Sequence, residues 1–316
     1  MTVINRRLPG RCPRIVVVGS ANIDLVARSA RLPEPGETVT GSSFMMVPGG
    51  KSANQAVAAA RLGAETYFVG RVGNDVFGGS LERSFSGAGV NTLFLKKDSA
   101  ESTGTALISV NETTGENCII VVPGANGKVS EADVAAAADV ISGADAVVLS
   151  LEIPLSAVAA ALEIASNFGV LTVLNPAPAI FLPDSIIRRC SILTPNEHEV
   201  GILAGGSAGT IRESAASLIK RGAGTVVVTL GGDGTYSLDS QGAESSVGSF
   251  PVANVVDTTA AGDCYTGALV VALCEGQDHG SAMRFAAAAA SICITRPGAQ
   301  SSLPRRGEVD LLLNDR

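Results

Sequence analysis

The chain has 316 residues, of which 46% are apolar and 17% are charged. A chain of this length and composition can bury a large hydrophobic core, so an intrinsically disordered protein is excluded. The formal net charge is −7, which argues against a nucleic-acid groove, because such a groove needs a basic stripe. The 36 glycines, together with only 4% aromatic residues, predict tight turns and closely packed backbones.

The first segment, residues 1–14, is basic but lacks the apolar stretch of a signal peptide. We expect residues 1–13 to form a flexible N-terminus. No apolar run reaches transmembrane length with the usual flanks. The six cysteines are scattered and form no Cys-x-x-Cys pair, which favours reduced core cysteines over a disulfide framework or a zinc site. We therefore expect a soluble, cytoplasmic protein that binds neither membrane nor nucleic acid.

Short β-branched runs alternate with longer alanine-rich segments along most of the chain. Apolar strands separated by helices are typical of a parallel sheet that is covered on both faces, so we expect an α/β fold. The expected strands are residues 15–18, 67–69, 146–149, 170–174, 191–193 and 225–230. The expected helices are residues 53–62, 75–88, 130–142, 154–168, 196–204, 210–222, 262–275 and 280–295.

Two stretches, residues 37–47 and 103–122, have strand-like patterns without a following helix. The second contains a polar loop at residues 111–116, which predicts a β-hairpin. Because open α/β sheets bind ligands beyond the carboxyl ends of their strands, a small sheet there would form a discontinuous lid. One exposed face of this lid could pair with a second subunit, so we expect a homodimer. The main domain is then assigned to residues 14–36, 48–102 and 123–316.

A polar turn, Gly19-Ser-Ala-Asn-Ile-Asp24, follows the first strand. It lacks the G-x-G-x-x-G fingerprint of dinucleotide-binding proteins. Asn22 and Asp24 place an amide and a carboxylate at a strand end, where they could hold vicinal hydroxyls. A simple turn is the alternative.

The next motif, Gly49-Gly-Lys-Ser52, looks like the end of a P-loop, but Met45 stands where a P-loop has glycine. Pro48 also interrupts the loop. The motif leads into an alanine-rich helix, whose first amides, with Lys51 and Asn54, suit a polyhydroxylated or anionic ligand. The alternative is a glycine-rich turn that is capped by Ser52.

A third motif, Thr194-Pro-Asn-Glu-His-Glu199, begins another helix. Asn196 and Glu199 are three residues apart and share a helix face, and their oxygens suit Mg²⁺. The alternative is an N-cap with a capping-box acid. His198 is expected on the surface.

A glycine-rich turn, Thr229-Leu-Gly-Gly-Asp-Gly234, follows an apolar strand. Its glycines would let a nucleotide phosphate or sugar approach the backbone closely. A plain β-hairpin is the alternative.

The most specific motif is Asp257-Thr-Thr-Ala-Ala-Gly-Asp263, which precedes a helical run. Ala260, Ala261 and Gly262 would present free amides at a helix N-terminus, where the helix dipole adds positive potential. Such a pocket stabilises the charge on a transferring phosphoryl group, and the adjacent Asp263 could take a proton from an attacking hydroxyl. An aspartate N-cap is the alternative.

Together these segments resemble the PfkB carbohydrate kinase family over residues 14 to about 304. Residues 49–56 resemble its N-terminal signature, residues 257–263 its C-terminal signature and residues 194–199 its magnesium-linked motif. The segments that look most like the family members that phosphorylate ribose are residues 35–41, 101–108, 175–179 and 295–300. The resemblance implies a three-layer α/β/α domain with a mostly parallel sheet and a small β-sheet lid.

The resemblance also implies roles for individual residues, with Asp263 as the general base and Ala260, Ala261 and Gly262 as the anion hole. The implied sugar-binding residues are Asn22, Ile23, Asp24, Gly50, Lys51, Ser52, Ala53, Asn54, Glu152 and Asp263. The implied ATP-binding residues are Asn196, Thr229, Leu230, Gly231, Gly232, Asp233, Gly234, Gly262, Asp263 and Ala287. A potassium-binding loop would comprise Asp257, Thr259, Cys293, Arg296, Gly298 and Ser302, and Asn196 and Glu199 would be linked to Mg²⁺.

Three positions depart from the family pattern. Ser52 stands where these kinases commonly have glycine, Thr259 where they have isoleucine or valine, and Ala287 where histidine or asparagine often lies near adenine. The implied activity is ATP-dependent phosphorylation of D-ribose at O5, giving D-ribose 5-phosphate. The alternatives are a kinase of this family for another substrate (deoxyribose, fructose, a ketodeoxy sugar acid or a nucleoside) and a non-catalytic ligand-binding protein.

Overall fold

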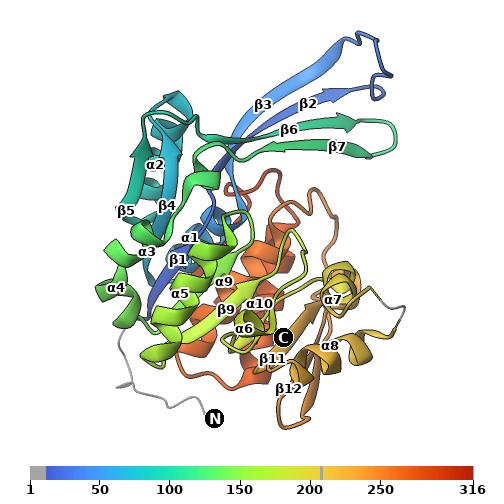
Figure 1. Cartoon of the computed structure of the whole chain (residues 1–316). Coiled ribbons are helices and arrows are strands. Elements are labelled where there is room, and N and C mark those ends of the chain that lie inside the picture. The colour runs from blue at the N-terminus through green and yellow to red at the C-terminus, as the bar shows by residue number, and fades with distance from the viewer. Residues whose placement is uncertain (1–11, 207–208, 316) are drawn as a thin grey trace.

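The computed structural model describes residues 12–206 and 209–315, so the N-terminus that was predicted to be flexible lies almost entirely outside the described residues. A nine-stranded sheet forms the body, in the order β13-β12-β11-β10-β9-β8-β1-β4-β5 (Figure 1). Neighbouring strands are parallel except at the edge, where β12 is antiparallel to both β11 and β13. Its strands are β1 (Arg14–Val18), β4 (Glu65–Gly73), β5 (Asn91–Asp98), β8 (Ala146–Ser150), β9 (Leu171–Asn175), β10 (Ile192–Leu193), β11 (Thr225–Thr229), β12 (Thr235–Asp239) and β13 (Glu244–Val247).

Helices cover both faces of this sheet, and β1 shows why. Ile15 and Val17 lie in one hydrophobic core while Val16 and Val18 lie in the other, since successive side chains of a strand point to opposite faces. The first core is closed by α1 (Lys51–Arg61), α2 (Val76–Ala88), α9 (Ala261–Cys274), α10 (His279–Cys293) and α11 (Arg306–Asn314). The second is closed by α3 (Glu131–Ala136), α4 (Ala138–Ser142), α5 (Leu155–Asn167), α6 (Asp184–Ile187), α7 (Glu197–Leu203) and α8 (Ile211–Lys220). The predicted three-layer α/β/α fold is confirmed.

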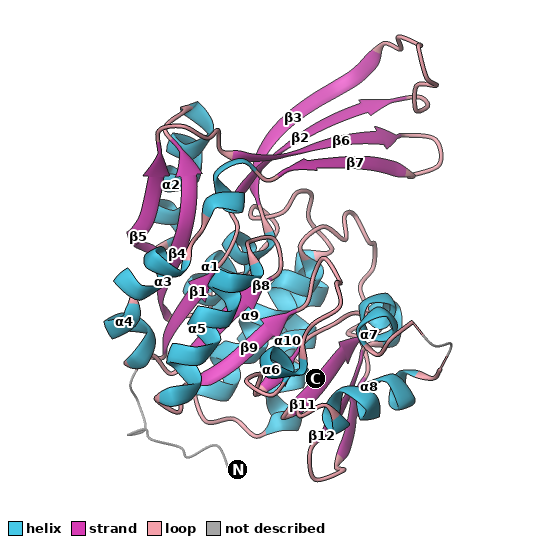
Figure 2. Cartoon of the chain, in the orientation of Figure 1, coloured by secondary structure: helices cyan, strands magenta, loops and turns pink. Residues whose placement is uncertain are grey.

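A separate four-stranded sheet, in the order β3-β2-β6-β7, projects from the body beyond the carboxyl ends of its parallel strands (Figure 2). It consists of β2 (Asn22–Ser29), β3 (Gly41–Gly49), β6 (Gly104–Asn111) and β7 (Asn117–Val122). Residues 37–47 and 103–122 were predicted to form this sheet. The sequence analysis left β2 in the main domain, but β2 pairs antiparallel with β3 and parallel with β6, so it is a central strand of the small sheet.

Other elements differ from the sequence predictions in detail. The predicted helix at residues 130–142 is divided into α3 and α4 around Ala137. The sequence analysis did not identify β5, β12, β13, α6 or α11, nor the short 3₁₀ turns η1 (Gly124–Lys128) and η2 (Gly231–Asp233). Among the described helices, none is both long and apolar enough to cross a membrane.

The cysteines only partly match the prediction of core thiols. Cys190, Cys264, Cys274 and Cys293 are buried, but Cys12 and Cys118 are exposed, so the prediction is wrong for these two. Cys118 lies on β7, whose residues are all exposed because no layer covers that strand. Cys12 precedes β1 at the start of the described chain.

Candidate functional site

Polar residues follow the carboxyl ends of five strands of the large sheet, and parallel strands end at the same edge. These residues are Ser20 after β1, Glu152 after β8, Asn175 at the end of β9, Thr194 after β10 and Thr229 at the end of β11. Two cavities of about 390 and 210 Å³ open at this edge. Both are lined by Thr229, Thr258, Ala261 and Gly262, so the two cavities adjoin.

Asp263 lies in the first turn of α9 and lines the smaller cavity. Asn54 Nδ2 donates a hydrogen bond to Asp263 Oδ2 at 2.9 Å, and Gln55 Nε2 donates one to Oδ1 at 3.1 Å. Burial raises the pKa of Asp263 to about 6, although the Lys51 ammonium and the two amides act in the opposite direction. A carboxylate with this pKa can hold and release a proton near neutral pH.

A close approach of two helices brings these side chains together. A Cβ atom added at Gly267 of α9 would lie 2.9 Å from both Ala58 Cβ and Gln55 O of α1. Only glycine therefore permits the observed spacing between α1 and α9. The sequence analysis missed Gln55, and the signal that could have found it is a large polar residue inside an alanine-rich helix.

An acidic group surrounds Lys51. Burial, together with the carboxylates of Glu152 and Asp263, raises the pKa of Asp24 to about 7 against the opposing effect of Lys51. Glu152 Oε2 accepts hydrogen bonds from Ser20 Oγ at 2.5 Å and from the Lys51 amide at 3.1 Å. The predicted sugar residues Asp24, Lys51, Glu152 and Asp263 thus interact with one another, and they combine acceptors with one cation in the way a polyhydroxylated ligand requires.

The Asn22 side chain is oriented by Asn126, which the sequence analysis did not identify. Asn126 Nδ2 donates to Asn22 Oδ1 at 2.7 Å, and Asn126 Oδ1 accepts from the Ala21 amide at 2.9 Å. Asn22 therefore keeps its own Nδ2 available. Gly50, the N-cap of α1, has φ 91°, and a Cβ atom there would lie 2.7 Å from Asn22 N. Gly50 thus lets the start of α1 pack directly against this segment.

Three predicted sugar-binding side chains point into the protein instead. Ile23 and Ala53 are fully buried in the hydrophobic core. The Ser52 hydroxyl is also fully buried and is hydrogen-bonded to Ser150 Oγ at 2.7 Å. The side chains of these three residues stabilise the packing around α1. Of all the predicted sugar-binding residues, Lys51 and Asp263 are the two that line the smaller cavity.

The N-terminus of α9 provides the predicted anion hole in altered form. Ala260 is the N-cap, with a left-handed φ of 62°, so the alternative of an aspartate cap is not observed. The Ala261 amide donates to Thr258 O at 3.2 Å, so the prediction that it is free is wrong. Within the described part of the chain, the amides of Gly262 and Asp263 have no acceptor, as expected in the first turn of a helix.

The residues of the predicted cation loop lie next to this helix start. Asp257 accepts hydrogen bonds from the Thr259 and Gly298 amides, both at 2.9 Å. Cys293 Sγ lies 3.0 Å from Ser302 Oγ and 3.8 Å from Thr259 O. The Arg296 side chain, in contrast, forms an ion pair with Glu308. The structure thus brings the two segments of the predicted loop together, while the Arg296 side chain pairs with Glu308.

Asn196 and Glu199 form the capping box that was considered as an alternative. Asn196 Oδ1 accepts from the amides of His198 and Glu199, and the Asn196 amide donates to Glu199 Oε2 at 2.8 Å. Both residues also line the smaller cavity, and His198 is exposed as predicted. The capping box uses Glu199 Oε2, and the predicted link to Mg²⁺ stays a prediction.

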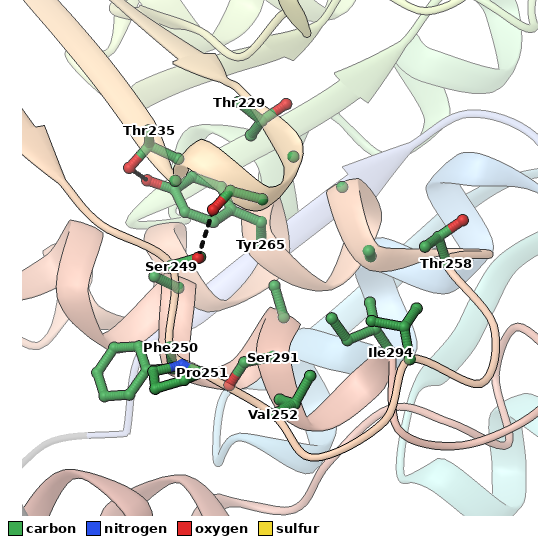
Figure 3. Close-up of a pocket in the computed structure, with 18 residues that line it drawn as sticks. Thr229, Thr235, Ser249, Phe250, Pro251, Val252, Thr258, Tyr265, Ser291 and Ile294 are labelled. Atoms are coloured by element: carbon green, nitrogen blue, oxygen red, sulfur yellow. Dashed lines mark hydrogen bonds between the residues drawn. The ribbon is translucent and has the colours of Figure 1, made fainter.

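The larger cavity has mostly apolar walls (Figure 3). Among the predicted ATP residues, Thr229, Gly231, Gly232, Gly234, Gly262 and Ala287 line it, whereas Leu230 and Asp233 line neither cavity. The sequence analysis missed the segment 249–252, which crosses one side of the cavity, and the apolar residues Val255 and Ile294. Ser249 Oγ fastens this segment to the glycine turn through a 2.5 Å hydrogen bond to Gly232 O.

Known proteins are similar to this chain in sequence and in fold. The pfkB family carbohydrate kinase model matches residues 13–306. A ribokinase of Haemophilus influenzae is 41% identical over 297 residues, which cover 93% of this chain and 96% of the relative. A deoxyribokinase of Salmonella typhi is 36% identical over 294 residues, which cover 92% of this chain and 95% of the relative.

The solved structures agree with the sequence relatives. A structure of Arabidopsis thaliana ribokinase complexed with ribose and ATP superposes with a TM-score of 0.88 at 36% identity and covers 96% of this chain and 99% of that one. The match extends over both the large sheet and the small sheet. The chain belongs to the PfkB family of carbohydrate kinases.

Proposed function

We propose that this chain is an ATP-dependent kinase that phosphorylates D-ribose at its 5-hydroxyl. One observation carries the proposal: the buried Asp263 carboxylate lies at the helix N-terminus where two adjoining cavities meet. A base and an anion hole at one point are what phosphoryl transfer to a hydroxyl requires. The ribokinase relatives, at about 40% identity over nearly the whole chain, support ribose as the acceptor.

The sugar would bind between α1 and the start of the small sheet. Asn22 Nδ2, Asp24, Lys51 and Glu152 offer donors and acceptors to the ring hydroxyls, and Asn54 Oδ1 is buried without a hydrogen-bond partner in the described structure. This arrangement leaves the 5-hydroxyl directed at Asp263. As the hydroxyl attacks, its proton passes to the Asp263 carboxylate, the O5–phosphorus bond forms and the bond between the γ-phosphorus and the leaving ADP oxygen breaks.

ATP would occupy both cavities. The apolar walls of the larger cavity suit a base and ribose, with Ala287 giving space but no polar contact. The triphosphate would extend into the smaller cavity, where the unpaired amides of Gly262 and Asp263 and the Lys51 ammonium stabilise the charge on the transferring group. The net charge of the chain is −7, so nucleotide binding depends on these local groups and not on a basic surface.

The residues fit the two metal ions that the family implies. Glu199 and Asn196 supply oxygen atoms at the smaller cavity, and Mg²⁺ commonly binds through one or two carboxylates, retained waters and substrate phosphates. When bound there, Mg²⁺ would neutralise part of the phosphate charge. The segments around Asp257 and Gly298 supply a carboxylate and backbone carbonyls, which are hard oxygen ligands suited to K⁺.

A homodimer through the small sheet is part of the proposal. Both faces of this sheet expose large apolar side chains, and such exposed apolar surface marks an interaction site. Because successive strand residues alternate between the faces, the strand registers place Phe44, Met46, Leu107, Ile120 and Val122 on one face and Met45, Ile119 and Val121 on the other. Sedimentation at micromolar concentration should give a dimer, and Ile120→Asp should give a monomer, whereas a monomeric wild-type chain would contradict this part. A cytoplasmic location also belongs to the proposal, since the described cysteines are free thiols.

A coupled assay of ADP release, with ATP and Mg²⁺, tests the activity. Ribose should support turnover, and omission of K⁺ should lower the rate. 2-Deoxyribose is the second candidate, because a deoxyribokinase is 36% identical to this chain. A higher kcat/KM on deoxyribose than on ribose would replace the proposed substrate, and ribose binding without turnover would point to a non-catalytic protein.

A further inference from the structure

Gln55 is a buried polar residue whose described hydrogen bonds are made inside the protein. Its side chain belongs to α1, is 1% exposed and lines neither cavity. Gln55 Nε2 donates to Asp263 Oδ1 at 3.1 Å and to Asn175 Oδ1 at 3.3 Å, while Gln55 Oε1 has no partner among the described residues. Leaving a buried amide oxygen without a partner is unfavourable, so some other requirement keeps a glutamine at this position.

The orientation of the Gln55 amide is fixed from the far side by a backbone carbonyl. Thr194 O can only accept, and Asn175 Nδ2 donates to it at 2.7 Å. The Asn175 Oδ1 atom must therefore face Gln55, and the Gln55 NH₂ group must donate a hydrogen bond to it. The second N–H of that group then faces Asp263. A flipped Gln55 would place its oxygen against two acceptors.

The carboxylate of Asp263 is thus held from two sides by consecutive residues of one helix. Asn54 donates to Oδ2 and Gln55 donates to Oδ1. These two donors on α1 therefore fix the positions of both carboxylate oxygens. Asn54 also belongs to the proposed sugar site, whereas the hydrogen bonds described for the Gln55 side chain go only to Asp263 and Asn175. The two donors can therefore be separated by experiment.

We propose that Gln55 is a positioning residue for the general base, and that the chain of amides from Thr194 O through Asn175 fixes the direction of its donor. This inference rests on the proposed function, because it assigns Gln55 to the proton transfer from the sugar hydroxyl. It predicts that Gln55 favours the ionised form of Asp263 and leaves sugar affinity unchanged.

Other groups also act on Asp263 and must stay in place in any test. Lys51 on α1 faces it with a positive charge, and Glu152 and Asp24 face it with negative charges from the loop after β8 and from β2. Cys264 and Cys293, from α9 and α10, lie close enough to interact with it electrostatically. A substitution at Gln55 alters none of these residues, so a change in the titration of the base can be assigned to the lost donor.

The experiment measures kcat and the KM for ribose from pH 5 to pH 9 in the full-length wild type and in Gln55→Met, which preserves the length of the side chain. Loss of a hydrogen bond to a charged group should move the acid limb of kcat upward by about one pH unit. At pH 6, kcat should fall by about fivefold, and at pH 5 by nearly tenfold, while at pH 9 it should approach the wild-type value. The KM for ribose should stay within about twofold, since the KM reports binding and Gln55 does not touch the sugar.

Two further variants keep the test decisive. Gln55→Glu has nearly the same shape but adds a negative charge beside Asp263, so it should move the acid limb of kcat to still higher pH. This variant replaces Gln55→Met in the test if Gln55→Met does not fold. Thr172→Val is the matched control. Thr172 is 1% exposed, donates to Arg189 O at 2.5 Å and lies near the amino end of β9, away from both cavities, so its loss should leave the limb unmoved.

An unmoved acid limb in Gln55→Met, or a limb that moves equally in Thr172→Val, would overturn the proposed role of Gln55. A higher KM with an unchanged limb would also overturn it, because it would place Gln55 in sugar binding. Absence of wild-type turnover on ribose would overturn the proposed function itself, and this result is read before any variant is compared.

Discussion

Asp257 and Asp263 lie at the two ends of one short segment, and their surroundings move their pKa values in opposite directions. Burial alone would raise the pKa of Asp257, but hydrogen bonds from the Thr259 side chain and from the Thr259 and Gly298 amides outweigh it and lower that pKa. Burial of Asp263 raises its pKa to about 6, and the opposing effects of Lys51, Asn54 and Gln55 do not cancel it.

The difference shows how one segment can provide both a fixed anion and a base. Backbone amides cannot turn away, so the two that bind Asp257 keep it charged and hold the loop to the segment after α10. Side-chain amides bind Asp263 inside a desolvated pocket, where the charged and neutral forms are closer in free energy. We infer that Asp257 keeps its charge, which holds this loop and the proposed K⁺ site in place, and that Asp263 exchanges a proton.

The largest expected effect comes from Asp263→Asn. The variant keeps the size of the side chain but cannot accept the proton, so kcat should fall by about 10²–10⁴, the usual size of a general-base effect. ATP binding should persist, because the Gly262 and Asp263 amides belong to the backbone. Steady-state assays and calorimetric ATP titration measure the two quantities. Near-normal turnover would remove Asp263 from the role of base.

The second prediction concerns the pH dependence of the wild type. Asp263 must be ionised to accept a proton, so kcat/KM should fall about tenfold per pH unit as the pH drops below about 6. Asp24, with a pKa of about 7, titrates nearby, and the two apparent values belong to the acidic cluster as a whole. A pH–rate profile with no acid limb between pH 5 and pH 8 would contradict the raised pKa values.

The third prediction tests the packing that brings α1 to Asp263. Gly267→Ala places a Cβ atom 2.9 Å from Gln55 O, so α9 must shift, with a loss of about 1–3 kcal/mol of stability. The shift moves Asp263 relative to its two amide donors, and kcat should fall by about tenfold. Urea unfolding and steady-state assays measure both.

Gly87→Ala is the matched control for this substitution. Gly87 lies in α2, and a Cβ atom added there would meet no other atom within 4 Å. This variant should gain about 0.5–1 kcal/mol of stability from better helix propensity and keep its activity. If both variants behaved alike, the close approach at Gly267 would have no functional meaning.

The sequence alone predicted the six central strands of the large sheet and the loops of the site, because both are encoded locally. Runs such as residues 15–18 are apolar on both faces. The motifs at residues 49–54 and 257–263 are each contiguous in the sequence, so their glycines and polar residues can be recognised together. The small sheet was predicted only in part. The strand β2 has no clean alternation, and its first residues were interpreted as part of the polar turn at residues 19–24. Its place depends on pairing with β3 and β6.

Contacts between distant residues could not be read from local patterns. The hydrogen bond from Asn54 to Asp263 joins residues 209 positions apart, and Gln55, Asn175 and Asn126 take their roles from similar contacts. The segment 249–252 has no secondary structure, so no periodicity marked it as a cavity wall. The Ala261 amide was predicted to be free because it stands at a helix N-terminus. Its hydrogen bond to Thr258 O depends on the left-handed backbone of Ala260, which the sequence pattern does not indicate.

The smallest expected effect comes from Asp257→Asn, the counterpart of the substitution at Asp263. The neutral amide of this variant could accept only one of the two backbone N–H groups well, so stability at pH 7 should fall by about 1–2 kcal/mol, a range that allows for solvent screening of a partly exposed group. Because the pKa of Asp257 is lowered in the folded state, its contribution is present above the usual value of 3.8 and is lost as the pH falls below it.

Urea unfolding of the wild type and Asp257→Asn at pH 7, 5 and 3 measures this contribution, and the difference in stability should shrink only at the lowest pH. The loss in kcat should be at least about tenfold smaller than for Asp263→Asn, since Asp257 does not take the proton. Equal losses of kcat in the two variants would mean that the segment acts as a single catalytic unit. In that case the opposite pKa shifts of its two aspartates would not separate a structural residue from a base.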